Sequence, residues 1–422
     1  MVKQMEQLEQ TEAEVFSSKI DAKESKKIQI LMNFYGLGGH PEFLYNMILN
    51  FSFVGGQTFL VKLLIKLDYK PRLIVMFIPL IILQIALPFI VQYIESKASW
   101  NVSILFMVLI GTFMGNIIST FCGIGGLLGP QYMGSYFQGL SLSSIFACIL
   151  RLICLLLFDS SNELSYFYST LLYFSLNAVI QIILCLTLPL SHVKQHLFLD
   201  KVQSETQPQK LETRDIKEEE VAVNTNQQDE IVYFKEDLQA DQLSERNITN
   251  DQKVNYITIY KKIWVETTFA SFTFLLTYLL FPGIIFQGGM TISSNFVWNI
   301  FYYNASFNVG DYSGRFLAKL KKQYGRVFII IGGLLRLIWI ASTFIIAFNH
   351  QNIFWGNNAV IVINCYLLGM THGFLGACCN QSFGGRLENH EKEHGGFMIS
   401  VLQSLGVAFG SLISLVAFKD MF

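Results

Sequence analysis

The sequence predicts an all-α, polytopic membrane protein, from its composition, its long apolar stretches and the scarcity of charge within them. Of the 422 residues, 52% are hydrophobic and only 14% are charged, and 37 are phenylalanine. The mean hydropathy is +0.42. A soluble domain carries about 25% charged residues, so this chain is expected to lie in a lipid bilayer. The net charge of −1 argues against nucleic acid as a partner.

Ten stretches are long and apolar enough to cross a bilayer, which takes about 20 residues of helix. Proline ends a helix and glycine allows a turn, so Gly129 and Pro130 separate the third stretch from the fourth. The ten predicted spans are Glu42–Lys66, Arg72–Ile94, Ser103–Leu128, Gln131–Phe158, Leu164–Leu190, Asn255–Pro282, Ser294–Leu317, Gly325–Phe348, Asn357–Gln381 and Gly395–Phe418.

A polar segment at 191–254 divides these spans into five before and five after. It contains runs such as Lys217-Glu218-Glu219-Glu220, few aromatic residues and no apolar period, so we expect a disordered cytosolic loop. The segment 191–254 is expected to be a solvated linker, and a regulatory role is the alternative. The sequence therefore predicts an N-terminal helix bundle at 42–190 and a C-terminal bundle at 255–422. Residues 1–41 form a polar segment that does not read as a cleaved signal peptide.

Basic residues indicate the orientation in the membrane. The loops after the first and the seventh span are rich in lysine and arginine, whereas those at 95–100, 159–163 and 349–358 are poor in them. Alternation places the basic loops and the segment 191–254 in the cytosol. With ten spans both termini come out external, although the N-terminal lysines favour the cytosol. An eleventh span would remove this conflict, but the apolar run at 28–39 is too short to complete one.

Asp311 and Arg315 are charged residues inside a predicted span. A charge at the bilayer centre costs about 2.5–3.5 kcal/mol on insertion scales and usually marks the path of a solute or an ion. Because they are four residues apart, the two side chains share one helix face. They can therefore also pair with each other in a purely structural role. Asn308 adds a third hydrogen-bonding side chain, and the three together favour a solute path.

Three other charged residues are interpreted as intramembrane. Arg336 lies near the middle of its span, where it forms a structural or gating ion pair or contacts the solute directly. Arg151 lies near the end of its span, where packing or reaching towards the interface is favoured over an ion pair or gating role. Glu266 is expected to cap or flank a helix start, where the positive end of the helix dipole stabilises an acid.

No arrangement typical of an enzyme is visible in the sequence. There is no Ser/His/Asp triad, P-loop or HExxH motif in a position to act, and most of the seven histidines lie at the edges of loops. Gly123-Ile124-Gly125-Gly126 lies inside a span, where it indicates close helix packing through small residues. We therefore expect neither an enzyme nor a metal or cofactor site.

The residues around Asp311 resemble a known family. The run Phe307-Asn308-Val309-Gly310-Asp311-Tyr312-Ser313-Gly314-Arg315 resembles F-N-x-x-D-x-x-G-R, the signature of the equilibrative nucleoside transporters. Similar runs of the family occur at Phe113–Tyr132, at 277–282, and at 393–398 followed by 405–410. The resemblance thus extends through most of the chain.

The resemblance implies a major-facilitator-like fold of eleven helices, six plus five, in the plasma membrane, with a cytosolic N-terminus. It implies that nucleosides, or alternatively nucleobases, pass down their gradient by alternating access between two bundles. By position, Asn308, Asp311 and Arg315 match polar residues of the family's central cavity. Asp311 would accept hydrogen bonds from ribose hydroxyls, and Arg315 would donate to the ribose or the base. Thr120 falls where the fourth helix of the family has a small hydroxyl residue.

The chain departs from the family pattern in two places. Ile118 stands where the family commonly has a glutamine that hydrogen-bonds the base, and Asn116 is half a turn away. Most of the family's first helix is missing after Gly38, which agrees with the charge conflict above and suggests an incomplete chain or a degenerate paralogue. The alternatives to nucleoside transport are therefore a non-transporting membrane protein and a carrier of another small polar solute. Proton coupling stays open.

Overall fold

The computed structural model describes residues 41–60, 63, 69–93, 96–158, 163–190, 255–281, 283–287, 292–293, 296–321 and 323–418. The polar segments predicted at 1–41 and 191–254 lie outside these residues, except for Pro41. Every regular element in the described ranges is helical, which confirms the all-α fold class. The elements are α2 (Pro41–Gly55), η1 (Gly56–Leu60), α4 (Tyr69–Tyr93), α5 (Ser96–Leu128), α6 (Pro130–Leu157), α7 (Glu163–Leu190), α10 (Tyr256–Leu280), α11 (Gly283–Gln287), α12 (Phe296–Ala318), α13 (Arg326–Leu335), α14 (Leu337–Phe348), α15 (Asn358–Ser382), η2 (Gly384–Arg386), η3 (Asn389–Glu391) and α16 (Lys392–Phe418).

A helix occupies each of the ten predicted spans, and seven helices of the described part are long and apolar enough to cross a membrane. The predicted span Gly325–Phe348 is not continuous, however, because it divides at Arg336 into α13 and α14. At this point the Arg336 N–H donates to the Gly333 carbonyl (3.3 Å) and the Trp339 N–H donates to the Arg336 carbonyl (3.0 Å). These hydrogen bonds join residues three apart, as in a 3-10 helix, and tighten the helix locally. Hydrophobicity alone does not reveal this break.

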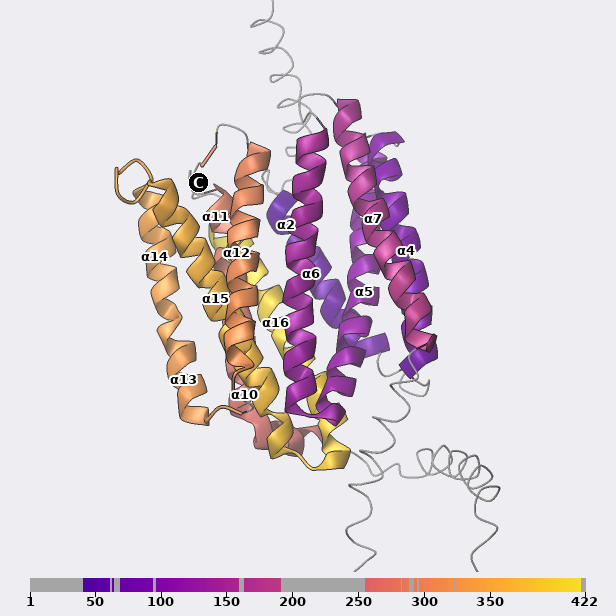
Figure 1. Cartoon of the computed structure of the whole chain (residues 1–422), viewed down its shortest axis with the longest axis vertical. Helices are drawn as coiled ribbons and strands as arrows, with labels where there is room; N and C mark the ends of the chain where they lie inside the picture. Colours follow the sequence, from indigo (N-terminus) through magenta and orange to yellow (C-terminus); the bar gives the residue numbers. More distant parts are fainter. Residues whose placement is uncertain are drawn as a thin grey trace, which may run out of the picture.

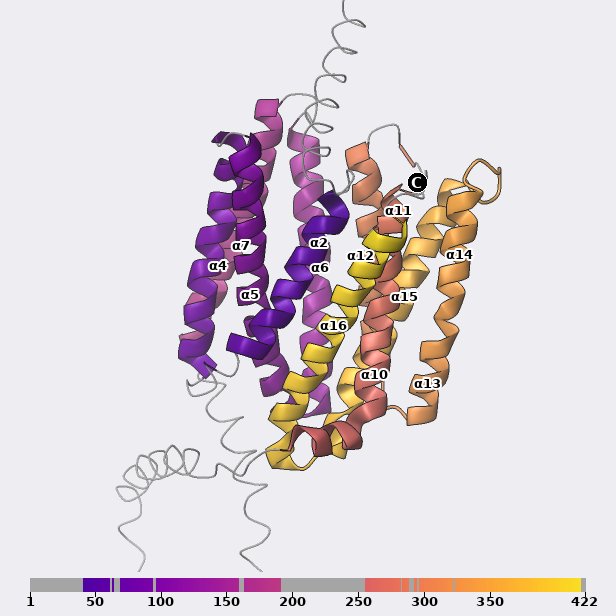
Figure 2. The ribbon, with the colours of Figure 1, turned by 180° about the vertical axis from the view of Figure 1, so that it is seen from behind.

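The helices form two bundles that lie side by side (Figure 1). One contains α2 and α4–α7, and the other contains α10–α16. The turn predicted at Gly129-Pro130 joins α5 to α6, and Gly129 has φ 97°, which glycine adopts without steric cost. The bundles meet where α16 packs on α2 and α5, and where α12 packs on α6. Figure 2 shows α2 and α16 next to each other on the opposite side of the molecule from α12 and α6.

Glycines bring α12 and α15 into close contact. A Cβ atom at Gly310 or Gly314 would collide with backbone atoms of α15, and one at Gly369 or Gly373 would collide with backbone atoms of α12. Small residues let two helix backbones approach in this way inside a membrane. Two of the four glycines belong to the run around Asp311, so this run also builds the helix pair that carries the charged residues.

Glycines of α5 play the same part on the other side of the interface. Cβ atoms at Gly111 and Gly115 would collide with the backbone of α2. A Cβ at Gly123 would meet the Phe397 ring, and one at Gly126 would meet the Lys392 carbonyl, both in α16. The close packing that the sequence predicted for the glycine-rich run is therefore present.

Candidate functional site

Asp311 and Arg315 form an ion pair within one turn of α12. The Arg315 Nε lies 2.9 Å from Asp311 Oδ2, and Asp311 is 4% exposed. Arg315 also reaches the other bundle, because its Nη1 donates to the Phe137 carbonyl of α6 at 3.0 Å. Its guanidinium carbon lies 5.5 Å from the centre of the Phe137 ring. The pair is therefore both an internal ion pair and a bridge between the bundles.

His372 of α15 completes this site, and sequence reasoning missed it. Its Nε2 lies 4.0 Å from Asp311 Oδ1, and its Nδ1 lies 3.0 Å from Thr277 Oγ1 of α10. The ring is buried between Phe274 and Phe307, with centroids 4.5 Å and 5.8 Å away. Its position in the middle of an apolar span, next to packing glycines, is the sequence feature that could have identified it as a site residue.

Arg336 joins the same network from the junction of α13 and α14. Its Nη2 donates to Thr277 Oγ1 at 2.7 Å, and the residue is 2% exposed. Within the described part of the chain, no acidic oxygen lies within 4.0 Å of its guanidinium. The buried polar series thus runs from Arg336 through Thr277 and His372 to Asp311 and Arg315. It joins four separate segments of the C-terminal bundle.

The other predicted site residues lie at different distances from this network. Asn308 faces α6, where its Nδ2 lies 3.2 Å from Cys148 Sγ. Thr120 is buried in α5 and its hydroxyl donates to the Asn116 carbonyl at 2.8 Å. Arg151 is half-buried in α6. The structure therefore brings Asp311 and Arg315 together, with Asn308 on the same helix, whereas Thr120 belongs to the separate interface of α2, α5 and α16.

Several buried polar atoms at that interface have no hydrogen-bond partner. They are Gln57 Oε1, both amide atoms of Asn116, Ser119 Oγ and Gln403 Nε2. Gln57 Nε2 donates to Ser400 Oγ of α16 at 2.8 Å, which fixes η1 against α16. By helical period, Asn116 and Ser119 share the face of α5 that carries Gly115 and Gly123, and Gln403 shares the face of α16 that carries Ser400. We call Gln57, Asn116, Ser119 and Gln403 the α5-side cluster.

Glu266 lies inside α10, three residues after a kink at Ile263 (φ −123°, ψ 23°) where a second helical segment begins, so it does flank a helix start as predicted. It is fully buried and forms ion pairs with Arg386 of η2 and, at 3.5 Å, with Arg326 of α13. Nearby, Lys262 lies 2.8 Å from Glu391. Since a buried charge needs a partner, Glu266 is explained by arginines that are distant in sequence. These pairs tie α10, α13 and the α15–α16 connection together at one end of the bundle.

Tyr324 closes the same end between α12 and α13. Its hydroxyl donates to the Ala318 carbonyl and its N–H donates to Ser382 Oγ, both at 2.9 Å. Burial raises the pKa of Tyr324 to about 12, so the hydroxyl stays protonated and remains a donor. Among the residues that the structure describes, no group of three His, Cys, Asp or Glu side chains could hold a metal ion.

Comparisons with known proteins agree with this architecture. A family model described as "Nucleoside transporter" matches residues 104–418. Equilibrative nucleoside transporter 4 from Danio rerio is 20% identical over 169 residues, which are 40% of this chain and 32% of that protein. The match thus spans about a third of the length of this curated relative.

A solved structure shares the fold. It is that of the proton:xylose symporter XylE, of the major facilitator superfamily, bound to 6-bromo-6-deoxy-D-glucose. The TM-score is 0.58 at 11% sequence identity, over 90% of this chain and 80% of that chain. The major-facilitator-like arrangement expected from the sequence is therefore confirmed. At this identity the likeness concerns the fold alone.

Proposed function

The chain belongs to the nucleoside transporter family, and from this premise we propose that it carries nucleosides across a membrane, down their gradient. The observation that supports this most is the buried network around Asp311, inside a bundle whose other contacts are largely apolar. Charged and hydrogen-bonding groups inside a membrane are costly and usually serve a solute path. A nucleoside carries hydroxyls and base edges that can hydrogen-bond both the acceptors and the donors of this network.

In the proposed complex the ribose binds on the α12 side. The Asp311 carboxylate accepts hydrogen bonds from ribose hydroxyls, and Arg315 donates to the ribose or the base. Asn308 provides a further amide on the same helix, next to α6. His372 and Thr277 hold Asp311 in position from α15 and α10. These positioning contacts are independent of the solute, so the α12 side is formed before the solute arrives.

The base binds on the α5 side in this proposal. Ile118 packs against the apolar core and cannot hydrogen-bond a base. Asn116, in contrast, carries an amide donor and an amide acceptor that are both buried without partners. An unmade buried hydrogen bond costs about 1–3 kcal/mol, which a solute with matching groups would recover. Thr120 lies one turn from Asn116, and its hydroxyl donates to the Asn116 backbone carbonyl, which leaves the Asn116 side-chain amide free for the base.

Transport requires the two bundles to rock against each other around the bound solute. Among the described residues the polar contacts between them are few. Arg315, Lys319 and Asn308 bind Phe137, Gln138 and Cys148 of α6. Gln57 and Asn50 bind Ser400 and Ser411 of α16. Each such bond contributes about 0.5–1.5 kcal/mol net, so breaking a small number of them is within reach of solute binding. Arg336 takes no part in these contacts and is assigned to gating through Thr277.

Uptake of labelled adenosine or uridine into cells that express this chain tests the proposal. We expect uptake that Asp311→Ala and Arg315→Ala each reduce to background, while Gln351→Ala, which alters an exposed residue between α14 and α15, leaves it unchanged. Unlabelled nucleosides should compete, and nucleobases should compete less well because they lack the ribose. Uptake that persists in both alanine variants would contradict the site. Competition only by unrelated solutes would assign the carrier to a different small polar substrate.

A further inference from the structure

A cavity lies on the outer flank of the C-terminal bundle, away from α2 and α4–α7. It has a volume of about 440 Å³ and lies between α12, α13, α14 and α15. We call it the flank pocket, and define it by Phe328, Leu335, Arg336, Trp339, Thr371 and Leu375. Leu335 lines its rim and is 58% exposed, and α13 and α14 form one edge of the molecule in both overall views. In a membrane this rim faces the lipid.

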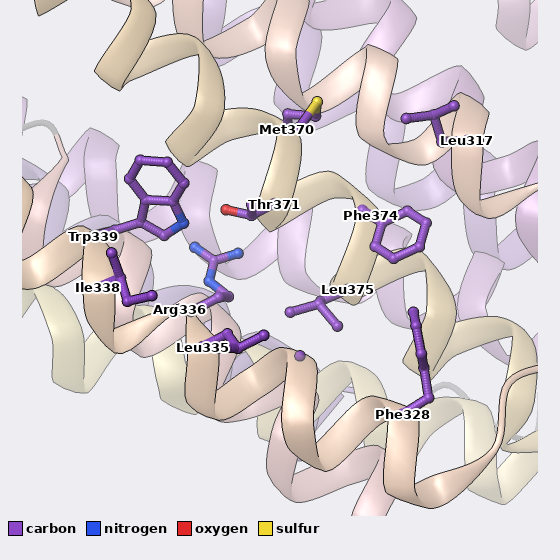
Figure 3. A pocket seen from close by; sticks show the side chains of 11 residues that line it. Leu317, Phe328, Leu335, Arg336, Ile338, Trp339, Met370, Thr371, Phe374 and Leu375 are labelled. Carbon is purple, nitrogen blue, oxygen red and sulfur yellow. The ribbon is translucent and has the colours of Figure 1, made fainter.

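One charged side chain points into this apolar pocket. Figure 3 shows the guanidinium of Arg336 among Trp339, Thr371 and Leu375. The residue is 2% exposed, and its Nε and Nη1 have no hydrogen-bond partner. Of its five N–H donors, the structure gives a partner only to one on Nη2, which donates to Thr277. Leaving buried charged donors unpaired is costly. The Nε and Nη1 of Arg336 therefore favour an acceptor group that would occupy the pocket.

The charges around Arg336 do not balance. Asp311 is the acidic group that acts on Arg336, and the same carboxylate is in direct ion pair with Arg315. Within this buried network two guanidiniums therefore share one carboxylate. A second acidic group beside Arg336 would restore neutrality and satisfy its Nε and Nη1. It would also form the charge-assisted bonds that arginine makes best with carboxylates.

We propose that the flank pocket binds a lipophilic carboxylic acid, of the kind represented by a single-chain fatty acid. The carboxyl group lies beside Arg336, and the hydrocarbon chain runs along Leu335 and Leu375 towards Phe328. The volume falls near the lower end of the range for small-molecule sites, which suits one chain rather than a two-chain phospholipid.

This site is separate from the proposed solute site but linked to it through Arg336, Thr277 and His372. An acid in the flank pocket would give Arg336 a second carboxylate partner besides Asp311. The binding itself requires no transport, so it can be measured whether or not the chain carries nucleosides.

The test is photolabelling of the full-length chain in phosphatidylcholine nanodiscs with a fatty acid that carries a diazirine in its chain. We expect label on peptides from 326–348 and 370–375. Oleate should displace it at a concentration at least about tenfold lower than oleyl alcohol does, because only the acid forms charge-assisted bonds with Arg336. Arg336→Gln should abolish this difference, and Arg336→Lys should retain part of it because the positive charge remains.

Adjacent leucines provide a matched control. Leu335 and Leu334 are 58% and 52% exposed, but only Leu335 lines the pocket. We expect Leu335→Trp to fill the rim and prevent labelling, and Leu334→Trp to leave it unchanged. This pair keeps Arg336, so the test survives if Arg336 variants do not fold. Two outcomes would overturn the proposal: equal displacement by oleate and oleyl alcohol, and labelling outside these peptides. Loss of label when phosphatidylglycerol is added would also overturn it, because the site would then bind a two-chain anionic lipid.

Discussion

The polar groups of the two sides of the bundle interface are in opposite states. On the α12 side, Asp311, Arg315, His372 and Thr277 form a connected series that is held by three segments of the C-terminal bundle, α12, α15 and α10. In the α5-side cluster, Asn116 and Ser119 are equally buried, yet their side chains lack partners. The difference indicates a rigid half that is ready to bind and a half whose hydrogen bonds are completed by something else. In the function proposed above, that partner is the solute.

The largest effect is expected for Asp311→Ala, which removes the only acid of the α12-side network. Arg315 and Arg336 then remain buried without a carboxylate, and breaking a buried pair in this way costs about 3–5 kcal/mol of stability. Thermal unfolding in detergent, followed by intrinsic fluorescence, should show a much lower midpoint. Exposed Gln351→Ala is the control and should unfold like the unmodified chain. An unchanged midpoint for Asp311→Ala would mean that the network is not rigid.

A smaller but clear effect is expected for Gly314→Ala. The added Cβ would collide with the Met370 carbonyl and the Phe374 nitrogen, and rigid backbone cannot yield as a side chain can. Overpacking of this kind costs about 1–3 kcal/mol, and it moves Asp311 away from His372. Gly139→Ala in α6 is the matched control, because nothing lies within 4 Å of its Cβ. Thermal midpoints of the two variants should differ clearly, and equal midpoints would refute the role of glycine packing.

His372→Ala should weaken uptake more than it weakens the fold. The imidazole lies 4.0 Å from Asp311 and hydrogen-bonds Thr277, and leaving such a buried partner without its bond typically costs about 1–3 kcal/mol. This corresponds to roughly a five- to 150-fold loss in nucleoside affinity. The measurement is KM for uptake together with maximal rate, because a positioning residue should change KM in the same direction for every nucleoside. A change confined to one base would instead place His372 at the base.

The smallest effect on stability is expected for Asn116→Leu. Its amide has no partner to lose, and an apolar side chain of similar size avoids the cost of burying it. Stability should therefore change by less than about 1 kcal/mol or rise slightly, while KM for nucleosides increases. Unfolding midpoints and uptake measured on the same preparation separate the two quantities. A loss of stability as large as that of Asp311→Ala would show that Asn116 has a structural partner after all.

Most of the fold could be predicted from the sequence, because a long apolar stretch is enough to identify a membrane span. Asp311 and Arg315 could be predicted as a pair because their spacing is local. The break at Arg336 could not, since Gly325–Phe348 is uniformly apolar around it. His372 and the arginines beside Glu266 were missed for another reason. Their partners are distant in sequence, and only helix packing brings them together.

Counterflow in proteoliposomes tests the central claim most directly, namely that the α12 side and the α5-side cluster together bind a nucleoside. Vesicles loaded with unlabelled adenosine are diluted into labelled adenosine, and exchange through the carrier concentrates the label inside for a time. We predict counterflow for the unmodified chain, no counterflow for Asp311→Ala, and counterflow that requires a higher adenosine concentration for Asn116→Leu. Counterflow of equal size in all three would contradict the account.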